Sequence, residues 1–171
     1  GDARDPSALE VLMQGDAARM VLTDPPFNVP VAGHITKRDT QAREFPMASG
    51  EMTPAEFTAF LTDSLGAAAR HAVDGSIHYV FMDWRHIQEV TTAGQTAIGP
   101  LKNLIVWAKP NAGMGAFYRS QHELVFVFKK GKAAHVNTFG LGEHGRYRTN
   151  VWTYPGASGF HADRQDDLAL H

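Results

Sequence analysis

The segment that decides the fold is Val21-Leu22-Thr23-Asp24-Pro25-Pro26-Phe27-Asn28. Its apolar, β-branched start predicts a buried strand, which ends abruptly at an acid and two prolines. Proline has a fixed φ and no backbone N–H, and it forces the preceding residue into an extended conformation. The Asp24 carboxylate and the Pro25 carbonyl are therefore expected to point in fixed directions. Phe27 adds a flat apolar face, so the turn is suited to holding a planar group that carries an amine.

The composition is that of an ordinary globular chain. With 171 residues, 43% of them hydrophobic, it can form one domain with a core. No apolar run approaches the roughly 18 residues needed to cross a bilayer, and no basic-then-apolar leader opens the chain, so we expect a soluble, cytoplasmic protein. The absence of cysteine excludes disulfides, thiolate metal sites and a cysteine nucleophile. The nine histidines show no ligand spacing, and we predict no metal site.

Charge is unevenly distributed along the chain. The net charge is only −2, but positions 101–150 hold eight Lys/Arg against two acids, whereas the rest holds eight against sixteen. A basic block of this kind is typical of a phosphate-binding face, although a solvated surface explains it equally well.

Helical and strand patterns alternate, which predicts an α/β layer. Helices are expected at Pro6–Gly15, from the capping box Thr53-Pro54-Ala55-Glu56 onward, and after Asp83; strands are expected to end at Thr23, Met82, Ala108 and Phe128. The first three strands should be parallel, and the last two should form an antiparallel pair at one end. Ligands of such sheets bind at the carboxyl ends of the strands, which places Asp24, Asp83, Lys109 and Lys129 at the predicted site.

Two segments outside this pattern have features of binding regions. Residues 30–50 contain Lys37 and Arg38 without an apolar period, and we expect a mobile loop over Asp24. Beyond residue 132 an irregular arm combines basic and aromatic side chains, which suits phosphate contacts with base stacking; these are Arg146, Arg148, Trp152 and Tyr154.

Three other motifs have competing interpretations. Gly140, Gly142 and Gly145 fit G-x-G-x-x-G, but no strand precedes them and no helix follows, so a dinucleotide site is disfavoured. The run Asp83-Trp84-Arg85-His86 is either a functional cluster or a helix cap followed by a core tryptophan. The run Arg119-Ser120-Gln121-His122-Glu123 is denser in polar groups than the start of a strand requires, and its functional and structural interpretations are evenly balanced.

Asp24-Pro25-Pro26-Phe27 at a strand end resembles the D-P-P-Y/F catalytic signature of the amino-group (N6-adenine/N4-cytosine) DNA methyltransferases. That family transfers methyl from S-adenosylmethionine to an exocyclic base amine. Residues 81–86, 119–123 and 146–152 resemble successive blocks of its beta class, in which the catalytic motif precedes the cofactor loop. The resemblance implies a Rossmann-like methyltransferase sheet, mostly parallel with an antiparallel pair at one end.

The resemblance also implies roles for individual residues. Asp24, Pro25, Pro26 and Phe27 are expected to be catalytic, and Asp2 and Asp24 to bind S-adenosylmethionine, because Gly1-Asp2 is similar to a block whose acid meets the adenosine. Double-stranded DNA is the expected partner, with the oligomeric state left open. The expected DNA contacts are Asn28, Lys37, Arg38, Lys109, Arg119, His122, Arg146, Arg148 and Trp152.

The sequence departs from the family pattern twice. Phe27 replaces the usual tyrosine, which keeps the stacking face and loses the hydroxyl. The F-x-G-x-G cofactor loop is missing from the 171 residues, so we expect an incomplete sheet and an inactive isolated chain. The expected division is a catalytic α/β region over 1–131, a target-recognition arm over 132–162, and the start of a truncated cofactor-binding part over 163–171.

Two other functions are consistent with the same residues. One is an RNA or protein amine methyltransferase that uses the same turn, and the other is a non-catalytic DNA-binding remnant. Within the DNA enzymes, the acid at the start of the motif looks more like the adenine-modifying members, so adenine N6 is favoured over cytosine N4.

Overall fold

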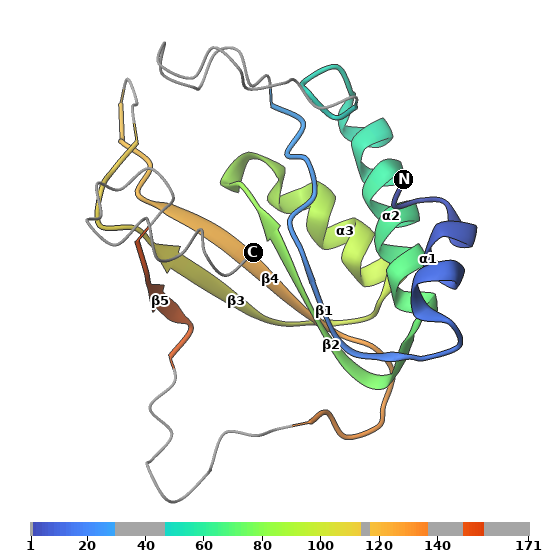
Figure 1. The fold of residues 1–171 in the computed structure, drawn as a ribbon. Coiled ribbons are helices and arrows are strands. Elements are labelled where there is room, and N and C mark those ends of the chain that lie inside the picture. The colour runs from blue at the N-terminus through green and yellow to red at the C-terminus, as the bar shows by residue number, and fades with distance from the viewer. Residues whose placement is uncertain (1, 30–46, 114–116, 137–148, 156–171) are drawn as a thin grey trace, which may run out of the picture.

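A computed structural model describes residues 2–29, 47–113, 117–136 and 149–155. These residues form a five-stranded sheet in the order β1-β2-β4-β3-β5 (Figure 1). The strands are β1 (Ala18–Thr23), β2 (Ala72–Met82), β3 (Leu101–Ala108), β4 (His122–Lys129) and β5 (Val151–Thr153). The helices are α1 (Pro6–Met13), α2 (Pro54–Arg70), the short 3-10 turn η2 (Trp84–His86) and α3 (Ile87–Ala97).

The strand directions confirm the α/β class and the antiparallel pairing of β3 with β4. β1 pairs in parallel with β2, and β3 with β5, while β4 is antiparallel to both β2 and β3. Two details differ from the prediction. β3 does not pair with β2, because β4 folds back and lies between them. β5 forms in a segment that we predicted to be irregular, since a strand of three residues gives too short a pattern to detect.

The reversed direction of β4 changes which residues meet at the carboxyl edge of the other strands. His122 pairs with Ala108 there, whereas Lys129 pairs with Ile77 at the opposite edge. The predicted placement of Lys129 beside Asp24 is therefore wrong. An antiparallel strand brings its first residues to this edge, so His122 and Glu123 occupy the place predicted for Lys129.

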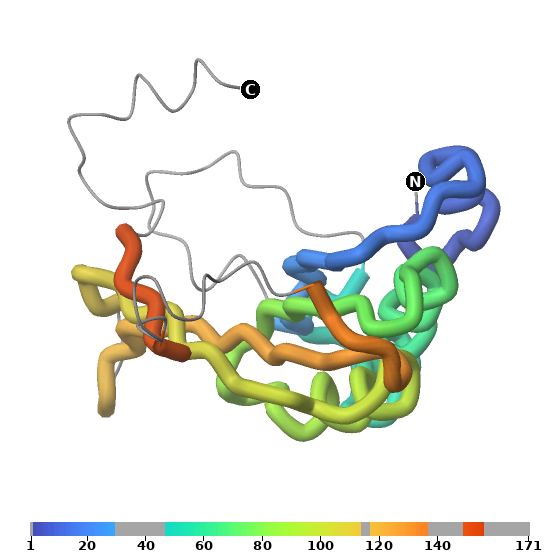
Figure 2. Tube along the Cα trace, turned by 90° about the horizontal axis from the view of Figure 1, so that it is seen from below, coloured from blue at the N-terminus to red at the C-terminus, as the bar shows by residue number. Residues whose placement is uncertain are grey.

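The main core lies between one face of the sheet and the helices α2 and α3, which pack against each other (Figure 2). The predicted capping box is confirmed, because Thr53 accepts from the Glu56 backbone and Glu56 reaches back to the Thr53 N–H. From this start α2 buries its apolar stripe, Phe57, Phe60, Leu61 and Leu65. None of the helices in the described ranges is long and apolar enough to cross a membrane.

A smaller apolar cluster lies on the other face of the sheet. Ile105, Val125 and Val127 are buried there, and Tyr79 and Trp152 pack against them. The centroids of the Trp152 and Tyr79 rings are 6.3 Å apart, so β5 is held to the sheet by side chains as well as by its ladder.

Polar groups near the edge opposite the carboxyl ends are buried or bound internally, although His78 Nδ1 has no hydrogen-bond partner in the described part of the chain. Lys130 Nζ donates to the carbonyls of Ala69 and Ala72, both at 2.6 Å, and so satisfies acceptors at the end of α2 and the start of β2. His78 is fully buried with its Nε2 3.0 Å from Ser76 Oγ. Burial, with a smaller contribution from Lys130, lowers the pKa of His78 to about 4, so this imidazole is neutral at physiological pH.

Candidate active site

The acid-proline turn begins directly where β1 ends, as predicted. The predicted burial of this strand is wrong, because β1 lies at the edge of the sheet and leaves Met20 and Leu22 exposed. β1 runs to Thr23, and Asp24 is the first residue beyond it. Phe27 is half-buried against the main core, which fixes the far end of the turn. The two prolines between them have no N–H to donate, so the turn presents carbonyl and carboxylate acceptors.

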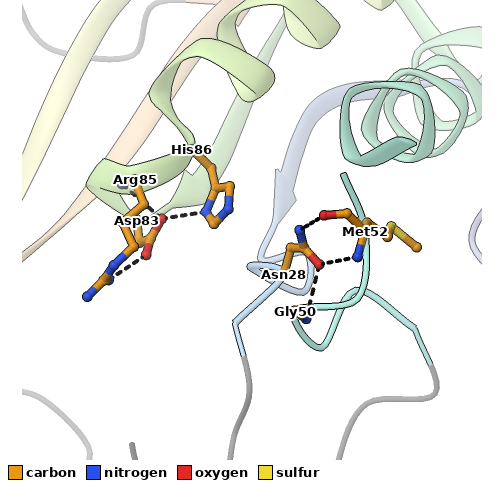
Figure 3. Close-up of polar contacts among 6 residues, drawn as sticks. All are labelled: Asn28, Gly50, Met52, Asp83, Arg85 and His86. Atoms are coloured by element: carbon orange, nitrogen blue, oxygen red, sulfur yellow. Dashed lines mark hydrogen bonds and ion pairs between the residues drawn. The ribbon is translucent and has the colours of Figure 1, made fainter. Parts of the chain in front are cut away.

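Asn28 anchors the turn to the segment before α2. Its backbone has a φ of 52°, a left-handed conformation that asparagine tolerates better than most residues. Its side-chain oxygen accepts from the N–H groups of Gly50 at 3.0 Å and Met52 at 3.2 Å, and its Nδ2 donates to the Met52 carbonyl at 2.8 Å (Figure 3). The side-chain amide that we predicted to contact DNA is therefore used inside the protein.

A cavity of about 360 Å³ opens beside Phe27 at the carboxyl edge of the sheet, and we call it the polar cavity because many of its lining residues are polar or charged. Its walls come from the turn, from the residues after β2, and from both sides of the β3–β4 connection. The lining includes Phe27, Asp83, Trp84, Lys109, Ser120, His122 and Glu123. Four predicted site residues, Phe27, Asp83, Lys109 and His122, are thus brought to one cavity.

Asp83 organises the wall contributed by the residues after β2. Its carboxylate accepts from the Arg85 N–H at 3.1 Å and Arg85 Nη1 at 2.9 Å, and it contacts His86 Nδ1 at 2.8 Å (Figure 3). The predicted cap is confirmed, but Trp84 is no core residue, since it is 54% exposed. The Arg85 guanidinium lies 4.8 Å from the Trp84 ring centroid, so the tryptophan presents a flat ring at the cavity without being buried.

Lys109 and Glu123 form an ion pair at the cavity and act on Asp24 with opposite signs. The pKa of Asp24 is raised by partial burial and then by the Glu123 charge, while Lys109 acts to lower it. A raised pKa makes the ionised carboxylate a stronger hydrogen-bond acceptor. The ion pair, which sequence patterns did not reveal, thus balances the electrostatics of the predicted catalytic acid.

A second cavity, of about 520 Å³, follows β1 on the other side of the turn. It is mostly apolar, and Asp24, Pro25 and Pro26 line its end. Ala3 lines it too, which brings the N-terminal block close to the turn. Asp2 itself is exposed and paired with Arg4 at 2.6 Å, and hydrogen bonds from Arg4 lower the pKa of Asp2 to about 2.

The remaining predicted DNA contacts are dispersed or lie elsewhere. Arg119 donates to the carbonyls of Gly113 and Ala112, at 3.0 and 2.9 Å, within the β3–β4 connection. Trp152 lines a different groove, on the face of the smaller apolar cluster. Lys37, Arg38, Arg146, Arg148 and the glycine motif at 140–145 lie outside the described residues.

The sequence model of the DNA methylase family, which covers the N6 and N4 enzymes, matches residues 18–165. The match includes the turn, both walls of the polar cavity and all five strands. The chain therefore belongs to the DNA methylase family. No curated protein matches its sequence.

Solved structures with the same fold are distant in sequence. M1.HpyAVI is 16% identical with a TM-score of 0.57, over 93% of this chain and 67% of its own. The M1.HpyAVI–SAM complex is 17% identical with a TM-score of 0.56, over 94% of this chain and 66% of its own. A DNA modification methylase from Thermus thermophilus, TTHA0409, is 19% identical with a TM-score of 0.53, over 99% of this chain and 71% of its own. The chain thus spans about two thirds of the length of these proteins.

Proposed function

We propose that this chain carries the catalytic part of an S-adenosylmethionine-dependent, beta-class DNA methyltransferase that modifies adenine N6. The observation that carries the proposal is the position of Asp24-Pro25-Pro26-Phe27 between two cavities at the carboxyl edge of the sheet. One cavity is lined by charged side chains and aromatic rings, and the other is lined mostly by apolar residues and ends at an acid. A reaction between two bound molecules needs such a pair of sites on either side of the reacting groups.

The turn would activate the amine by accepting its hydrogen bonds. An exocyclic amine is a poor nucleophile because its lone pair is delocalised into the base. Hydrogen bonds from the two N–H groups to the Asp24 carboxylate and the Pro25 carbonyl would return electron density to nitrogen as it attacks. Asp24 must be ionised to accept, so its raised pKa strengthens the acceptor as long as the pH stays above that pKa.

The polar cavity is our proposed site for the target base. A base inside a duplex cannot reach the turn, so it must be flipped out at a cost of a few kcal/mol. The Phe27 ring would then offer a stacking face, and the exposed Trp84 ring lines the same cavity.

The apolar cavity is our proposed cofactor side. Its volume of about 520 Å³ is within the range of sites that bind small molecules. Its chemistry also fits, because Asp24 places a carboxylate beside apolar walls, and S-adenosylmethionine has a cationic sulfonium together with a flat adenine ring and methylene groups. Asp2 would bind the adenosine end. When bound, the cofactor supplies the methyl group. The chain's own part is to orient it and to exclude water from the turn.

The direct test is transfer of labelled methyl from S-adenosylmethionine to unmethylated genomic DNA by the full-length protein. We expect Asp24→Asn to lower the rate by about 10²–10³-fold, because it removes the charged acceptor without changing size. Asp16→Asn is the matched control, since Asp16 is an exposed acid on the loop before β1.

Near-normal turnover by the Asp24→Asn variant would refute the catalytic role of Asp24. Label that enters RNA or peptide in preference to DNA would refute the substrate. Salt-dependent DNA binding without any methyl transfer would favour the DNA-binding remnant instead. Analysis of the labelled nucleosides distinguishes N6-methyladenine from N4-methylcytosine.

A further inference from the structure

The β3–β4 connection carries two of the most exposed aromatic side chains in the described part of the chain. Phe117 is 86% and Tyr118 84% exposed. Their rings contact each other edge to face, with centroids 4.4 Å apart. Apolar surface of this size is costly in water, and an adjacent exposed pair is typical of a binding surface rather than of an ordinary loop.

The base of this connection is held firmly, so the aromatic pair is presented from a rigid support. The Lys109 N–H donates to the Gln121 carbonyl at 2.9 Å, and the Gly113 N–H to the Ser120 carbonyl at 2.7 Å. Arg119 adds two hydrogen bonds to carbonyls across the connection. The strand pairing is thus extended beyond the sheet, at the same edge where β1 reaches the acid-proline turn (Figure 1).

The same connection lines the polar cavity. Asn111, Gly113 and Ser120 contribute to its wall together with Phe27. The connection between Ala108 and His122 contains no acid. Its Lys109 is paired with Glu123, but among the described residues the Arg119 guanidinium contacts only neutral carbonyls and keeps its positive charge, which suits a partner that carries phosphates. The exposed pair is therefore next to the proposed base site, on a segment whose charge is complementary to DNA.

We propose that Phe117 and Tyr118 form a wedge that inserts into the DNA base stack beside the target and stabilises the flipped state. This inference rests on the proposed function. Large apolar side chains can separate stacked base pairs, and aromatic rings can replace the lost stacking. The wedge occupies the space that the flipped base leaves, while Phe27 holds that base in the polar cavity.

The test compares two duplexes that differ only at the target. Sequencing of DNA methylated by the wild-type protein first defines the site. An oligonucleotide duplex is then made with the target base normally paired, and a second with an abasic position opposite it, so that little pairing energy opposes flipping. The proteins are full-length wild type, the double variant Phe117→Ala/Tyr118→Ala, and the conservative double variant Phe117→Trp/Tyr118→Phe.

We expect the alanine variant to methylate the paired duplex about tenfold more slowly or worse, given the worth of aromatic–base stacking. On the abasic duplex its rate should return to within a few-fold of wild type, and the conservative variant should resemble wild type on both. Rescue by the abasic position is the result that a folding defect would not give. Unchanged thermal unfolding of the alanine variant provides a second check.

Two outcomes would overturn the wedge. In the first, the alanine variant methylates the paired duplex as fast as wild type. This outcome includes the case in which Phe117 and Tyr118 instead join two copies of the chain, so that the variant changes only the molecular mass of the protein in solution. In the second, the loss is equal on both duplexes. If the wild-type protein methylates neither duplex nor genomic DNA, the proposed function fails instead.

Discussion

The polar side chains at the carboxyl edge of the sheet differ in their surroundings from those near the opposite edge. At the edge opposite the carboxyl ends, Lys130 is bound to two carbonyls and His78 is buried beside Ser76. At the carboxyl edge, Asp24 is only partly buried, and the Lys109–Glu123 ion pair lines a cavity. The first edge uses its polar groups to complete the fold, whereas the second pairs polar groups such as Lys109 and Glu123 with each other on the wall of a cavity.

The difference indicates that the residues that stabilise the sheet and the residues of the candidate site lie at different ends of the strands. Bound polar groups and tight packing at one end fix the positions of the strands, so that the residues just beyond the strands at the other end can remain exposed. Substitutions at the two edges should therefore have separable effects. Those near the first edge should change the free energy of unfolding, and those at the second should change the pH dependence of activity.

The largest effect on stability is expected at Gly94 of α3. Its Cα faces the buried ring of Phe128, which lies near the edge opposite the carboxyl ends. A Cβ built at Gly94 would overlap three carbons of that ring. Because Phe128 is fully buried, Gly94→Ala should lower the free energy of unfolding by about 3 kcal/mol through overpacking. Urea denaturation measures this directly.

Gly66→Ala in α2 is the matched control for this substitution. The nearest atoms to a Cβ there are 3.8 and 3.9 Å away, which is ordinary contact. The same change should therefore stabilise the protein by about 0.5–1 kcal/mol, since alanine favours helix more than glycine. Equal effects of the two substitutions would contradict the packing argument.

The second effect is pH-dependent and comes from His78. Its pKa is about 4 in the folded protein, against an ordinary value of 6.5, so the unfolded chain binds more protons between these values. The stabilising contribution is complete above about pH 6.5 and is lost as the pH falls toward 4. The expected loss is about 1–3 kcal/mol.

Urea denaturation between about pH 4 and 8 should show this slope, and His78→Phe should remove most of it. If the variant retains the wild-type slope, other groups cause it. Methylation near about pH 8, where His78 is neutral in both states, should depend little on this residue provided that the variant is folded.

The smallest effect is expected at the carboxyl edge, from the ion pair beside Asp24. Glu123 raises the pKa of Asp24 and Lys109 lowers it. Because the proposed mechanism requires the ionised Asp24 carboxylate, Glu123→Gln should move the acid limb of the pH–rate profile to lower pH, and Lys109→Met should move it to higher pH. The rate at the optimum should change by no more than about tenfold, which is about 1.4 kcal/mol.

The pH profiles of kcat/KM for the two variants should shift in opposite directions, while their urea midpoints stay unchanged. This result would show that the carboxyl edge affects activity without affecting stability. Shifts in the same direction would mean that the ion pair acts through structure rather than through charge. The control is Lys102→Met, because Lys102 is an exposed lysine in the same strand that precedes Lys109.

Local patterns predicted most of the elements. The capping box before α2 and the acid-proline end of β1 each require a particular backbone, so both could be predicted within a few residues. The placement of β4 between β2 and β3 could not be predicted in this way, because strand order depends on long-range pairing that periodicity does not encode. The misplacement of Lys129 followed directly from this.

Site residues could be predicted where a sequence motif has few structural explanations. They could not be predicted where the role of a side chain depends on its burial or on its neighbours in space. A strand that ends in Asp24-Pro25-Pro26 has few structural explanations, and the turn was found at once. Trp84 could equally have been a core residue, and only its exposure shows that it is not. Lys109 was predicted to contact DNA, but its pairing with Glu123 depends on two strands meeting in register.

The antiparallel insertion of β4 also has a consequence for how such a site can change. After a strand ends at this edge, a parallel crossover would lead the chain away from it. In the β3–β4 hairpin the next strand instead begins at the same edge, so residues from both sides of the connection line the polar cavity. Insertions or deletions between Pro110 and Ser120 therefore reshape the cavity without altering the strand register. If the turn is catalytic as proposed, a hairpin of this kind lets the cavity beside it change while the turn itself stays the same.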